Sequence, residues 1–377
     1  MRAFTPPKTN FISNTSTGIY IHIPYCSTIC YYCNFCKQLY NPEQAPVLVQ
    51  ALLQELEAYI NQAPDLRIHS IYIGGGTPST LKPAAIAALL TRIRSGWDCV
   101  SNCEITLEMN PDHVSDDWLP LILETGITRV SLGAQSNHAY ILAQLGRHHT
   151  WERVLSAIQV LRQVPISINS DLLYGMPDLN HQALLQSLTA YSTSQSDHIT
   201  VYSLIIEPGT PFYKCQQTRT VDEMASDYTV IDAVLCQAGF EAYDTAAFAK
   251  PGHIAWHNCA YWHFYPYIGI GPGSHSFFRG HRFRHPPTDA YIQNPIHASL
   301  QTSRPVPMQD RFEEWVMLGL RTRSGLDLDT AAAWFPTAIL KYHALIQTGY
   351  LTQDKTRIIA TRKGRRMLDS LAVMLLE

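Results

Sequence analysis

Apolar residues recur in two alternating patterns along the first two-thirds of the chain. Short runs rich in β-branched and aromatic residues predict strands, and these runs lie at 18–25, 69–75, 103–110, 129–136, 167–175 and 198–207. Between the runs, apolar residues return at helical spacing. Strands that alternate with helices indicate βαβ units and a parallel sheet. Six such units predict an α/β fold, an open partial (β/α)6 barrel whose chemistry gathers at the carboxyl ends of the strands.

Two of the helical stretches, 43–62 and 151–163, show the pattern in detail. In the first, Glu55 and Glu57 fall off the apolar stripe, as an amphipathic surface helix requires. Thr150 is the expected N-cap of the second helix. The residues that form the apolar stripe of the first helix are Val49, Leu52, Leu53, Leu56 and Ile60.

The pattern changes in the last third of the chain. Segment 240–308 is rich in Gly, Pro, His and aromatic residues and lacks a clear helical period, so we expect strands and loops that cover the barrel. From 309 to 377, three helical patterns precede a short strand pair around 350–360 and a last helix, an order that resembles a winged-helix module. The sequence thus predicts an N-terminal extension at 1–17, a barrel at 18–239, a connecting segment and a small C-terminal domain.

Composition and charge narrow the function classes. A net charge of −3 favours neither nucleic acid nor an acidic membrane as a partner. The chain has no run of about 18 apolar residues that would predict a membrane span, and its start lacks the apolar stretch of a signal peptide. We therefore expect a cytoplasmic protein that does not bind nucleic acid, with its C-terminal basic cluster forming a solvated face on a docking domain. That cluster comprises Lys355, Arg357, Arg362, Lys363, Arg365 and Arg366.

Four of the nine cysteines lie within eleven residues, as Cys26-x3-Cys30-x2-Cys33 with Cys36 three residues further on. In a cytosolic chain such clustering indicates metal or redox chemistry rather than disulfides. Thiolates are the usual ligands of iron–sulfur clusters, and three of them leave one iron of a four-iron cluster open to a small molecule. The cysteines follow a predicted strand, where a barrel places its site. The spacing therefore favours an open-site iron–sulfur cluster on Cys26, Cys30 and Cys33.

Two other metal sites match parts of this pattern. Zinc takes four ligands, and the four clustered cysteines could supply them. A ferredoxin run has the spacing C-x2-C-x2-C-x3-C-P, whereas here the wider gap comes first and Lys37 follows the last cysteine. On spacing alone, a four-cysteine zinc site remains an alternative. If Cys36 were a fourth ligand of an iron–sulfur cluster, it would occupy the iron that is otherwise free to bind a small molecule.

Polar residues also follow the predicted strands at their carboxyl ends. The run Gly74-Gly75-Gly76-Thr77-Pro78 comes after the second strand, where glycines permit close approach of the backbone to a ligand and expose N–H groups. An amino acid joined to a ribose would use carboxylates for its ammonium and hydroxyl groups and an arginine for its carboxylate. Singly, each polar residue could be a strand-end cap or a surface ion pair, but four at one barrel end indicate a binding site. These four are Glu108, Gln135, Arg147 and Asp171.

A series of segments from about Gly18 to the C-terminus carries a family resemblance. They are YIHIPYCSTICYYCNFC (20–36), GGGTPS (74–79), LEMNP (107–111), RVSLGAQS (129–136), LGRHHT (145–150), DLLYGMP (171–177), IEPGTPF (206–212), HNCAYW (257–262) and YIGIGPGSHS (267–276). With them the chain resembles the oxygen-independent coproporphyrinogen oxidase family of radical S-adenosylmethionine (SAM) proteins, and within it the branch of HemW haem chaperones. The expected barrel is then of the radical SAM type.

This resemblance implies a role for each matched position. Cys26, Cys30 and Cys33 would ligate a [4Fe–4S] cluster, and SAM would chelate its open iron through amino and carboxylate groups. The cofactors carry the chemistry, and the protein positions them and excludes water. The residues implied to line the SAM pocket are Tyr20, Gly76, Thr77, Glu108, Gln135, Arg147 and Asp171.

Three features favour the chaperone branch over the oxidase branch. The oxidases have a further cysteine two residues after the third ligand, where this chain has Phe35. They also carry a longer N-terminal extension than the 25 residues that precede Cys26 here. HNCAYW fits the HNxxYW motif of the chaperones, and its histidine, here His257, is implied to ligate haem through a neutral imidazole nitrogen. A packed histidine in an aromatic core is the alternative for His257.

The resemblance thus implies a haem chaperone that binds haem or a porphyrin, a [4Fe–4S] cluster and SAM, and delivers haem to a haem-requiring protein. The sequence does not identify that acceptor, and it leaves open a homodimer and a peripheral membrane contact made through the acceptor. The alternative function is that of an oxygen-independent coproporphyrinogen III oxidase, which decarboxylates its substrate to protoporphyrinogen IX. Whether the chain is an enzyme also stays open.

Overall fold

The computed structural model describes residues 16–214, 219–296, 302–336 and 340–376. Within these residues the central sheet has twelve strands, and six parallel strands follow one another through its middle in chain order. The predicted α/β partial barrel is therefore confirmed, while most of the expected N-terminal extension lies outside the described residues. The six barrel strands are β1 (Ser16–Ile23), β4 (Arg67–Gly75), β5 (Asp98–Met109), β6 (Arg129–Gln135), β7 (Ser167–Tyr174) and β8 (His198–Ser203).

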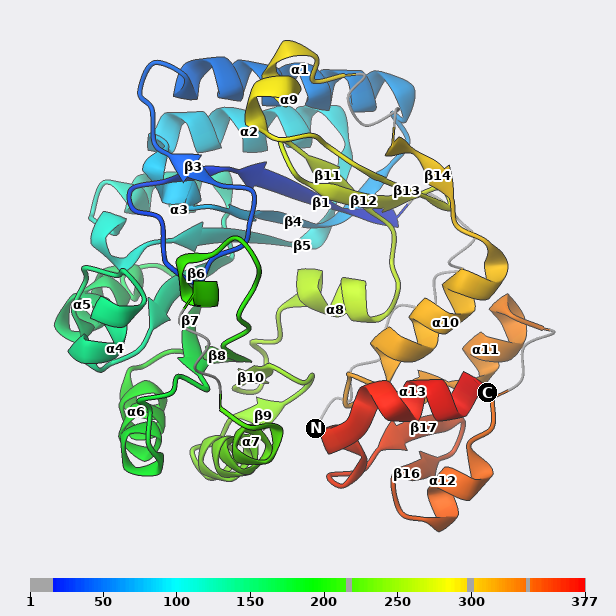
Figure 1. Cartoon of the computed structure of the whole chain (residues 1–377). Helices are drawn as coiled ribbons and strands as arrows, with labels where there is room; N and C mark the ends of the chain where they lie inside the picture. The colour runs from blue at the N-terminus through cyan, green and yellow to red at the C-terminus, as the bar shows by residue number, and fades with distance from the viewer. Residues whose placement is uncertain (1–15, 215–218, 297–301, 337–339, 377) are drawn as a thin grey trace.

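Helices cover the convex face of this sheet, as Figure 1 shows. Burial from the helices outside and from side chains inside explains the near-continuous apolar runs of the strands. The predicted N-cap of α5 is confirmed, because the Thr150 hydroxyl accepts the Arg153 N–H at 3.3 Å. The helices of the barrel are α1 (Ala45–Gln62), α2 (Pro83–Gly96), α3 (Trp118–Thr125), α4 (Ala139–Gln144), α5 (Trp151–Leu161), α6 (His181–Thr193) and α7 (Val221–Gln237).

The prediction that Glu55 lies on the solvent side of α1 was wrong. Its relative exposure is 1%, because the buried face of α1 is turned by about one residue from the predicted stripe and a later segment covers the helix. The Glu55 carboxylate lies 2.7 Å from His285 Nε2, accepts the Tyr291 hydroxyl at 2.6 Å and accepts the Gly271 N–H at 3.0 Å. Glu57, in contrast, is exposed as predicted.

Segment 240–308 adds strands to both edges of the central sheet and places a helix inside it. The predicted strands are present, but the expectation of strands and loops alone was wrong, because α8 (Trp256–Trp262) and α9 (Thr288–Gln293) also form. At six and seven residues, they are too short to show a helical period in sequence. Figure 1 places α8 inside the curve of the sheet, where it contacts β4 and α10 (Met308–Gly319). The edge strands are β9 (Glu241–Ala242), β10 (Ala247–Ala249), β11 (Tyr267–Ile270), β12 (His275–Phe278), β13 (His281–Arg284) and β14 (Arg304–Pro305).

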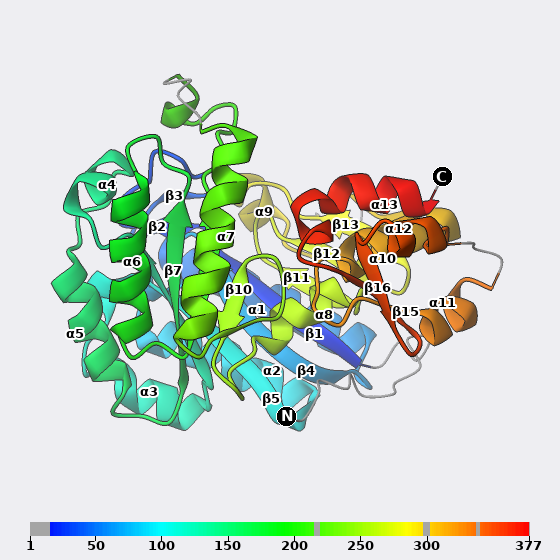
Figure 2. The same ribbon diagram turned by 90° about the horizontal axis from the view of Figure 1, so that it is seen from below.

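The C-terminal module packs beside the barrel, as Figure 2 shows. Its basic cluster contributes to that docking, because Arg362 pairs with Asp232 of α7 at 2.7 Å and Arg366 donates to the Thr229 hydroxyl at 3.0 Å. In the described ranges, no helix has the length and apolar character needed to cross a membrane. The module contains α10, β15 (Leu326–Asp327), α11 (Leu328–Trp334), α12 (His343–Gln347), β16 (Leu351–Asp354), β17 (Arg357–Ala360) and α13 (Leu368–Leu376).

Candidate functional site

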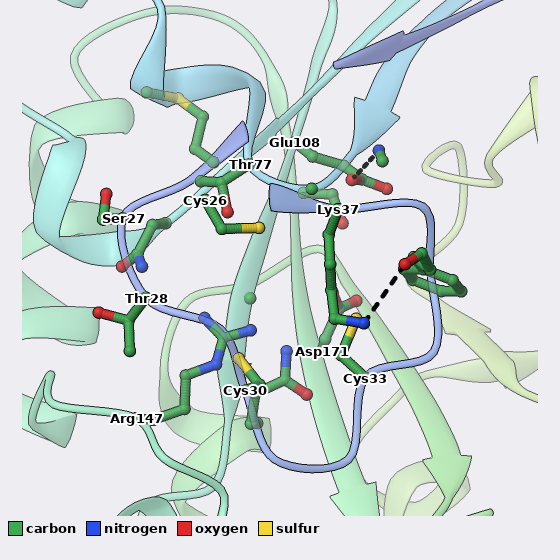
Figure 3. A pocket seen from close by; sticks show the side chains of 18 of the residues that line it. Cys26, Ser27, Thr28, Cys30, Cys33, Lys37, Thr77, Glu108, Arg147 and Asp171 are labelled. Carbon is green, nitrogen blue, oxygen red and sulfur yellow. Dashed lines mark hydrogen bonds between the residues drawn. The ribbon is translucent and has the colours of Figure 1, made fainter. Parts of the chain in front are cut away.

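The clustered cysteines lie on a loop that a short pair of parallel strands closes at its base. β2 (Tyr25–Cys26) pairs with β3 (Gln38–Leu39), so the loop between them leaves the barrel end and returns to it. Cys26 is buried, and Cys30 and Cys33 are half-buried. Figure 3 shows the three sulfur atoms turned toward one common space. The loop therefore brings together the three thiols predicted to act as cluster ligands.

A cavity of about 400 Å³ opens between this loop and the carboxyl ends of the barrel strands. This volume is in the range of small-molecule sites. The cavity gathers residues from segments that are far apart in the chain, as expected for this end of a barrel. The predicted residues that line it are Cys26, Cys30, Cys33, Gly76, Thr77, Glu108, Gln135, Arg147 and Asp171.

Two buried carboxyl groups, those of Glu108 and Asp171, face the cavity. Burial, together with the charge of the other group, raises the pKa of Glu108 to about 7. Burial likewise raises the pKa of Asp171 to about 6. Glu108 accepts the Tyr72 hydroxyl at 2.7 Å and the Gly75 N–H at 3.0 Å, and Asp171 accepts the Asn169 amide at 2.7 Å. These bonds fix both carboxyl groups in place, and their pKa values make their charge sensitive to pH near neutrality.

Arg147 supplies a positive charge beside the thiols. In Figure 3 its side chain reaches the space between Cys26 and Cys30. Burial raises the pKa of Cys30 and brings that of Cys26 to about 11, and the charge of Arg147 opposes this rise at both thiols. The Nε of Arg147 is buried and has no hydrogen-bond partner among the described residues. An anionic group in the cavity would be stabilised by this guanidinium.

The glycine run at the end of β4 serves close packing of the backbone. A Cβ atom on Gly76 would lie 2.7 Å from the carbonyl oxygen of Tyr25, so only glycine allows the two segments to approach. The expectation of exposed N–H groups was wrong, since Gly76 donates to Ile23 at 2.8 Å and Thr77 donates to Tyr25 at 2.7 Å. The Gly75 N–H is taken by Glu108, and Gly74 lies within the strand pairing of β4, opposite His22 of β1.

Gln135 ends β6 in a conformation that few residues other than glycine adopt. Its φ is 64°, in the left-handed region. The side-chain oxygen of this buried residue accepts the Tyr202 hydroxyl, which holds the amide at the cavity wall. Backbone strain of this kind persists where the surroundings over-determine it, as at ligand sites.

Comparison with known proteins agrees with this geometry. Residues 20–190 match the Radical SAM superfamily and residues 306–367 match the HemN C-terminal domain. The chain is 31% identical over 373 residues to the heme chaperone HemW of Mycobacterium tuberculosis, covering 95% of this chain and 94% of that protein. The chain belongs to the HemW family. It is also 30% identical over 357 residues to the heme chaperone HemW of Lactococcus lactis, covering 92% of this chain and 93% of that protein.

A solved structure supports the fold of this HemW family member. The coproporphyrinogen III oxidase HemN from Escherichia coli superposes with a TM-score of 0.82, covering 96% of this chain and 90% of that chain. Its sequence identity is 20%, so the likeness shows a common fold and not a common reaction.

The HNxxYW segment of this HemW family member lies on α8, behind the cavity wall. His257 is 1% exposed, and its Nδ1 lies 2.8 Å from the Ser70 hydroxyl while its Nε2 lies 2.7 Å from the Tyr261 hydroxyl. Burial holds the pKa of His257 well below its usual value, so the ring is neutral. The following residue, Asn258, does line the cavity. Both ring nitrogens of His257 are thus occupied within the protein.

Glu104 of β5 fixes the beginning of α8. Its carboxylate accepts the N–H groups of Trp256 and His257 at 2.8 and 2.9 Å. These are two of the backbone donors that a helix leaves unpaired at its start. The arrangement ties the orientation of the HNxxYW helix to one strand of the barrel.

Tyr20 and Cys36 lie apart from the cavity lining. The Tyr20 hydroxyl lies 2.9 Å from His22 Nδ1. Cys36 packs against Gly273, where an added Cβ would collide with it, and its carbonyl oxygen lies 2.8 Å from His22 Nε2. Cys36 therefore faces the turn after β11 rather than the three clustered thiols, and it is not placed to complete a four-cysteine zinc site.

Sequence reasoning missed several residues of the cavity wall. The buried Arg129 lines it, with Nε and Nη1 unpaired among the residues that the structure describes. Arg129 and Asn258 stand within the matched segments RVSLGAQS and HNCAYW, so the resemblance contained the signal that could have found them. Tyr202 lies in a strand outside those segments. The other missed lining residues include Ser27, Tyr32, Tyr72, His113, Asn169 and Thr200.

Proposed function

We propose that this chain is a haem chaperone that binds a [4Fe–4S] cluster and SAM in the barrel cavity and delivers haem to a haem-requiring protein. The observation that carries the proposal is that one cavity gathers three thiols with the buried carboxyl groups of Glu108 and Asp171, the amide of Gln135 and the guanidinium of Arg147. Two relatives named as heme chaperones, each at least 30% identical over more than nine-tenths of its length, support this choice.

The residues on the cavity wall fit an iron–sulfur cluster. Cys26, Cys30 and Cys33 would hold it, and Arg147 would offset its negative charge. When bound and reduced, such a cluster supplies an electron to SAM held at its open iron. Cys36 lies away from these thiols, which leaves the fourth iron position free for a ligand other than protein.

The remaining cavity residues fit the polar groups of SAM. Glu108 and Asp171, once deprotonated, would accept hydrogen bonds from the ammonium group and the ribose hydroxyls. Arg147 would pair with the carboxylate. Gln135 would bond the ligand through its amide, and the backbone at 76–77 would lie along it. Tyr20 would join this set only after its side chain turns from His22 toward the cavity.

For haem, we propose His257 as the iron ligand. Its burial means that coordination requires α8 to move or the Tyr261 bond to open. Neighbouring aromatic rings on and after α8 would then stack on the macrocycle. We place the protein in the cytoplasm, with an unidentified haem-accepting protein as its partner; a homodimer and a membrane contact through the acceptor are further proposals.

The alternative is an oxygen-independent coproporphyrinogen III oxidase. Phe35 lines the cavity with a relative exposure of 68%, at the position where the oxidases carry a further cysteine. An exposed aromatic ring offers a flat apolar surface to a macrocycle but no thiol chemistry. This residue favours binding over decarboxylation.

A paired experiment on one reconstituted, anaerobic sample tests the proposal. Haem titration is expected to give a saturable haem absorbance band, and coproporphyrinogen III supplied with SAM and a reductant is expected to remain unconverted. A sample with an intact cluster that binds no haem would overturn the chaperone function, and protoporphyrinogen formation would establish the oxidase instead. Cys33→Ala, which removes a proposed cluster ligand, separates cluster-dependent from cluster-independent haem binding.

A further inference from the structure

Two cysteines outside the cavity flank an irregularity at the beginning of β5, the end far from the cavity. Ile68 of β4 pairs with Cys99, but Ser70 pairs with Glu104, so β5 takes five residue steps where β4 takes two. The extra residues form a bulge between Cys99 and Cys103. Both thiols are half-buried, and neither lines the cavity.

The bulge brings the two cysteines close together, because Cys99 lies opposite Ile68 and Cys103 directly precedes the partner of Ser70. A hydrogen bond shared with Cys103 lowers the pKa of Cys99 below its usual value in spite of burial, and Cys103 Sγ also lies 3.8 Å from the carbonyl oxygen of Glu104. The charge of Arg94 acts in the same direction, whereas the shared hydrogen bond and burial raise the pKa of Cys103. One thiol is thus favoured as the thiolate and the other as its proton donor, the asymmetry found in reactive dithiols.

We propose that Cys99 and Cys103 form a reversible disulfide, which makes the beginning of β5 a site of redox modification. The oxidant is a low-molecular-weight disulfide such as oxidised glutathione. The Cys99 thiolate attacks one of its sulfur atoms, the oxidant's S–S bond breaks, and one glutathione leaves as a thiol after taking up a proton. Cys103 then loses its proton and attacks the Cys99 sulfur, which releases the second glutathione. Two protein thiols are oxidised and one disulfide is reduced to two thiols.

Closing this bond acts on α8 through the next residue along the strand. Glu104 follows Cys103 directly, and its carboxylate holds the N–H groups of Trp256 and His257. A disulfide across the bulge constrains the backbone at Cys103 and hence the position of that carboxylate. We therefore infer that the redox state of the pair changes the stability of the first turn of α8, whether or not haem binds there.

Peptide mapping of the full-length, cluster-loaded protein tests the disulfide. Cleavage after arginine and lysine releases residues 95–129 as one peptide, which contains Cys99 and Cys103 and no other cysteine. The protein is equilibrated anaerobically with oxidised glutathione, and its free thiols are blocked before digestion. The expected peptide carries no blocking group, is lighter than the reduced peptide by two hydrogen atoms, and returns to the reduced mass after treatment with a dithiol.

Single variants resolve the order of the two steps. Cys103→Ser should trap a mixed disulfide between Cys99 and glutathione, and Cys99→Ser should react more slowly, by about tenfold or more. Cys236→Ser, which removes an exposed thiol on α7, is the matched control and should leave the mass shift of the 95–129 peptide unchanged. A wild-type peptide that keeps two blockable thiols, or that carries two separate glutathione adducts, would overturn the disulfide.

Hydrogen exchange on the same samples tests the coupling. The amides of Trp256 and His257 should exchange at different rates in the oxidised and reduced proteins, whereas those in the middle of α6 should not change. Equal rates at Trp256 and His257 in a sample shown to contain the disulfide would overturn the inferred effect on α8.

Discussion

His257 and Tyr261 lie one turn apart on α8 and share a hydrogen bond, with 2.7 Å between Nε2 and the hydroxyl oxygen. Their rings meet edge to face, with centroids 4.8 Å apart. The second nitrogen of His257 is held by Ser70 at 2.8 Å. Haem iron needs a ring nitrogen with a free lone pair, but both ring nitrogens of His257, the ligand we propose, are occupied in this state. Haem must therefore displace either the Ser70 or the Tyr261 hydroxyl.

Removing the Tyr261 hydroxyl is therefore expected to strengthen haem binding. A hydrogen bond of this kind contributes about 0.5–1.5 kcal/mol net, so Tyr261→Phe should raise the affinity by roughly 2- to 10-fold. His257→Ala should lose the haem band or shift it. Titration followed by absorbance measures both. Tyr267→Phe, which removes a hydroxyl from the neighbouring ring and leaves the His257 bond in place, is the control. Equal affinity in Tyr261→Phe and wild type would argue against ligation through Nε2 of His257.

The two glutamates of α1 should differ sharply in their effect on stability. Glu55→Ala leaves the buried Tyr291 hydroxyl and the Gly271 N–H without their acceptor and removes the carboxylate beside His285, and each buried donor left unpaired costs roughly 1–3 kcal/mol. Glu57→Ala removes only a surface pair with Arg92, which is worth at most about 1 kcal/mol. Denaturant unfolding monitored by circular dichroism measures the difference. Similar losses in the two variants would mean that the Glu55 cluster does not stabilise the fold.

These two glutamates also show that the burial of a side chain cannot always be predicted from the local sequence. Each strand and long helix has a local period, which is why their order could be predicted. The burial of Glu55 is decided by Tyr291, 236 positions away, and no local pattern contains that information. The helix α8 has seven residues, too few for a period to show, and only two of them are buried.

The candidate site likewise contains some residues that the sequence predicts and others that only the folded chain brings there. Its carboxylates and thiols stand at strand ends or in a spaced motif, so residue type and position sufficed to find them. Asn258 and Tyr202 reach the cavity only because α8 and β8 fold against it. Cys36 lies away from the cavity because it packs against the turn at Gly273. Contacts between distant segments therefore account for the differences between the predicted and the observed cavity residues.

Substitution of Cys33 should reduce iron binding, whereas substitution of Cys36 should not. Cys33 faces the cavity with the other two thiols, whereas Cys36 packs against Gly273. Cys33→Ala is expected to lose most of the iron and the cluster absorbance after anaerobic reconstitution. Cys36→Ala should keep both near the wild-type level. Iron and sulfide analysis per chain gives the answer, and loss of iron in the Cys36 variant would point to a four-thiol site instead.

The carboxyl groups of the cavity should make SAM binding dependent on pH. Burial raises the pKa of Glu108 to about 7 and that of Asp171 to about 6, so both are largely neutral in mildly acidic solution. In the SAM site that we propose, at least one of them must be a carboxylate to accept hydrogen bonds from the amino group of SAM. Affinity should therefore rise as pH increases through 6 to 7, by about tenfold for each unit over which one required group titrates. Calorimetry at a series of pH values on the cluster-loaded protein measures it.

The sign of the accompanying stability change is opposite to that of binding. A carboxyl group whose pKa is raised on folding stabilises the folded state while it is neutral, fully below the usual value of 4.5 for Glu108, and this contribution is lost as pH rises through about 7. Glu108→Gln, which stays neutral, should lose less stability than wild type between these values and should weaken SAM binding at pH 8. Asp112→Asn, at an exposed cavity carboxyl, is the control and should leave the pH profile unchanged. A wild-type affinity that is flat across pH 6 to 7 would show that SAM binding does not rely on these carboxylates.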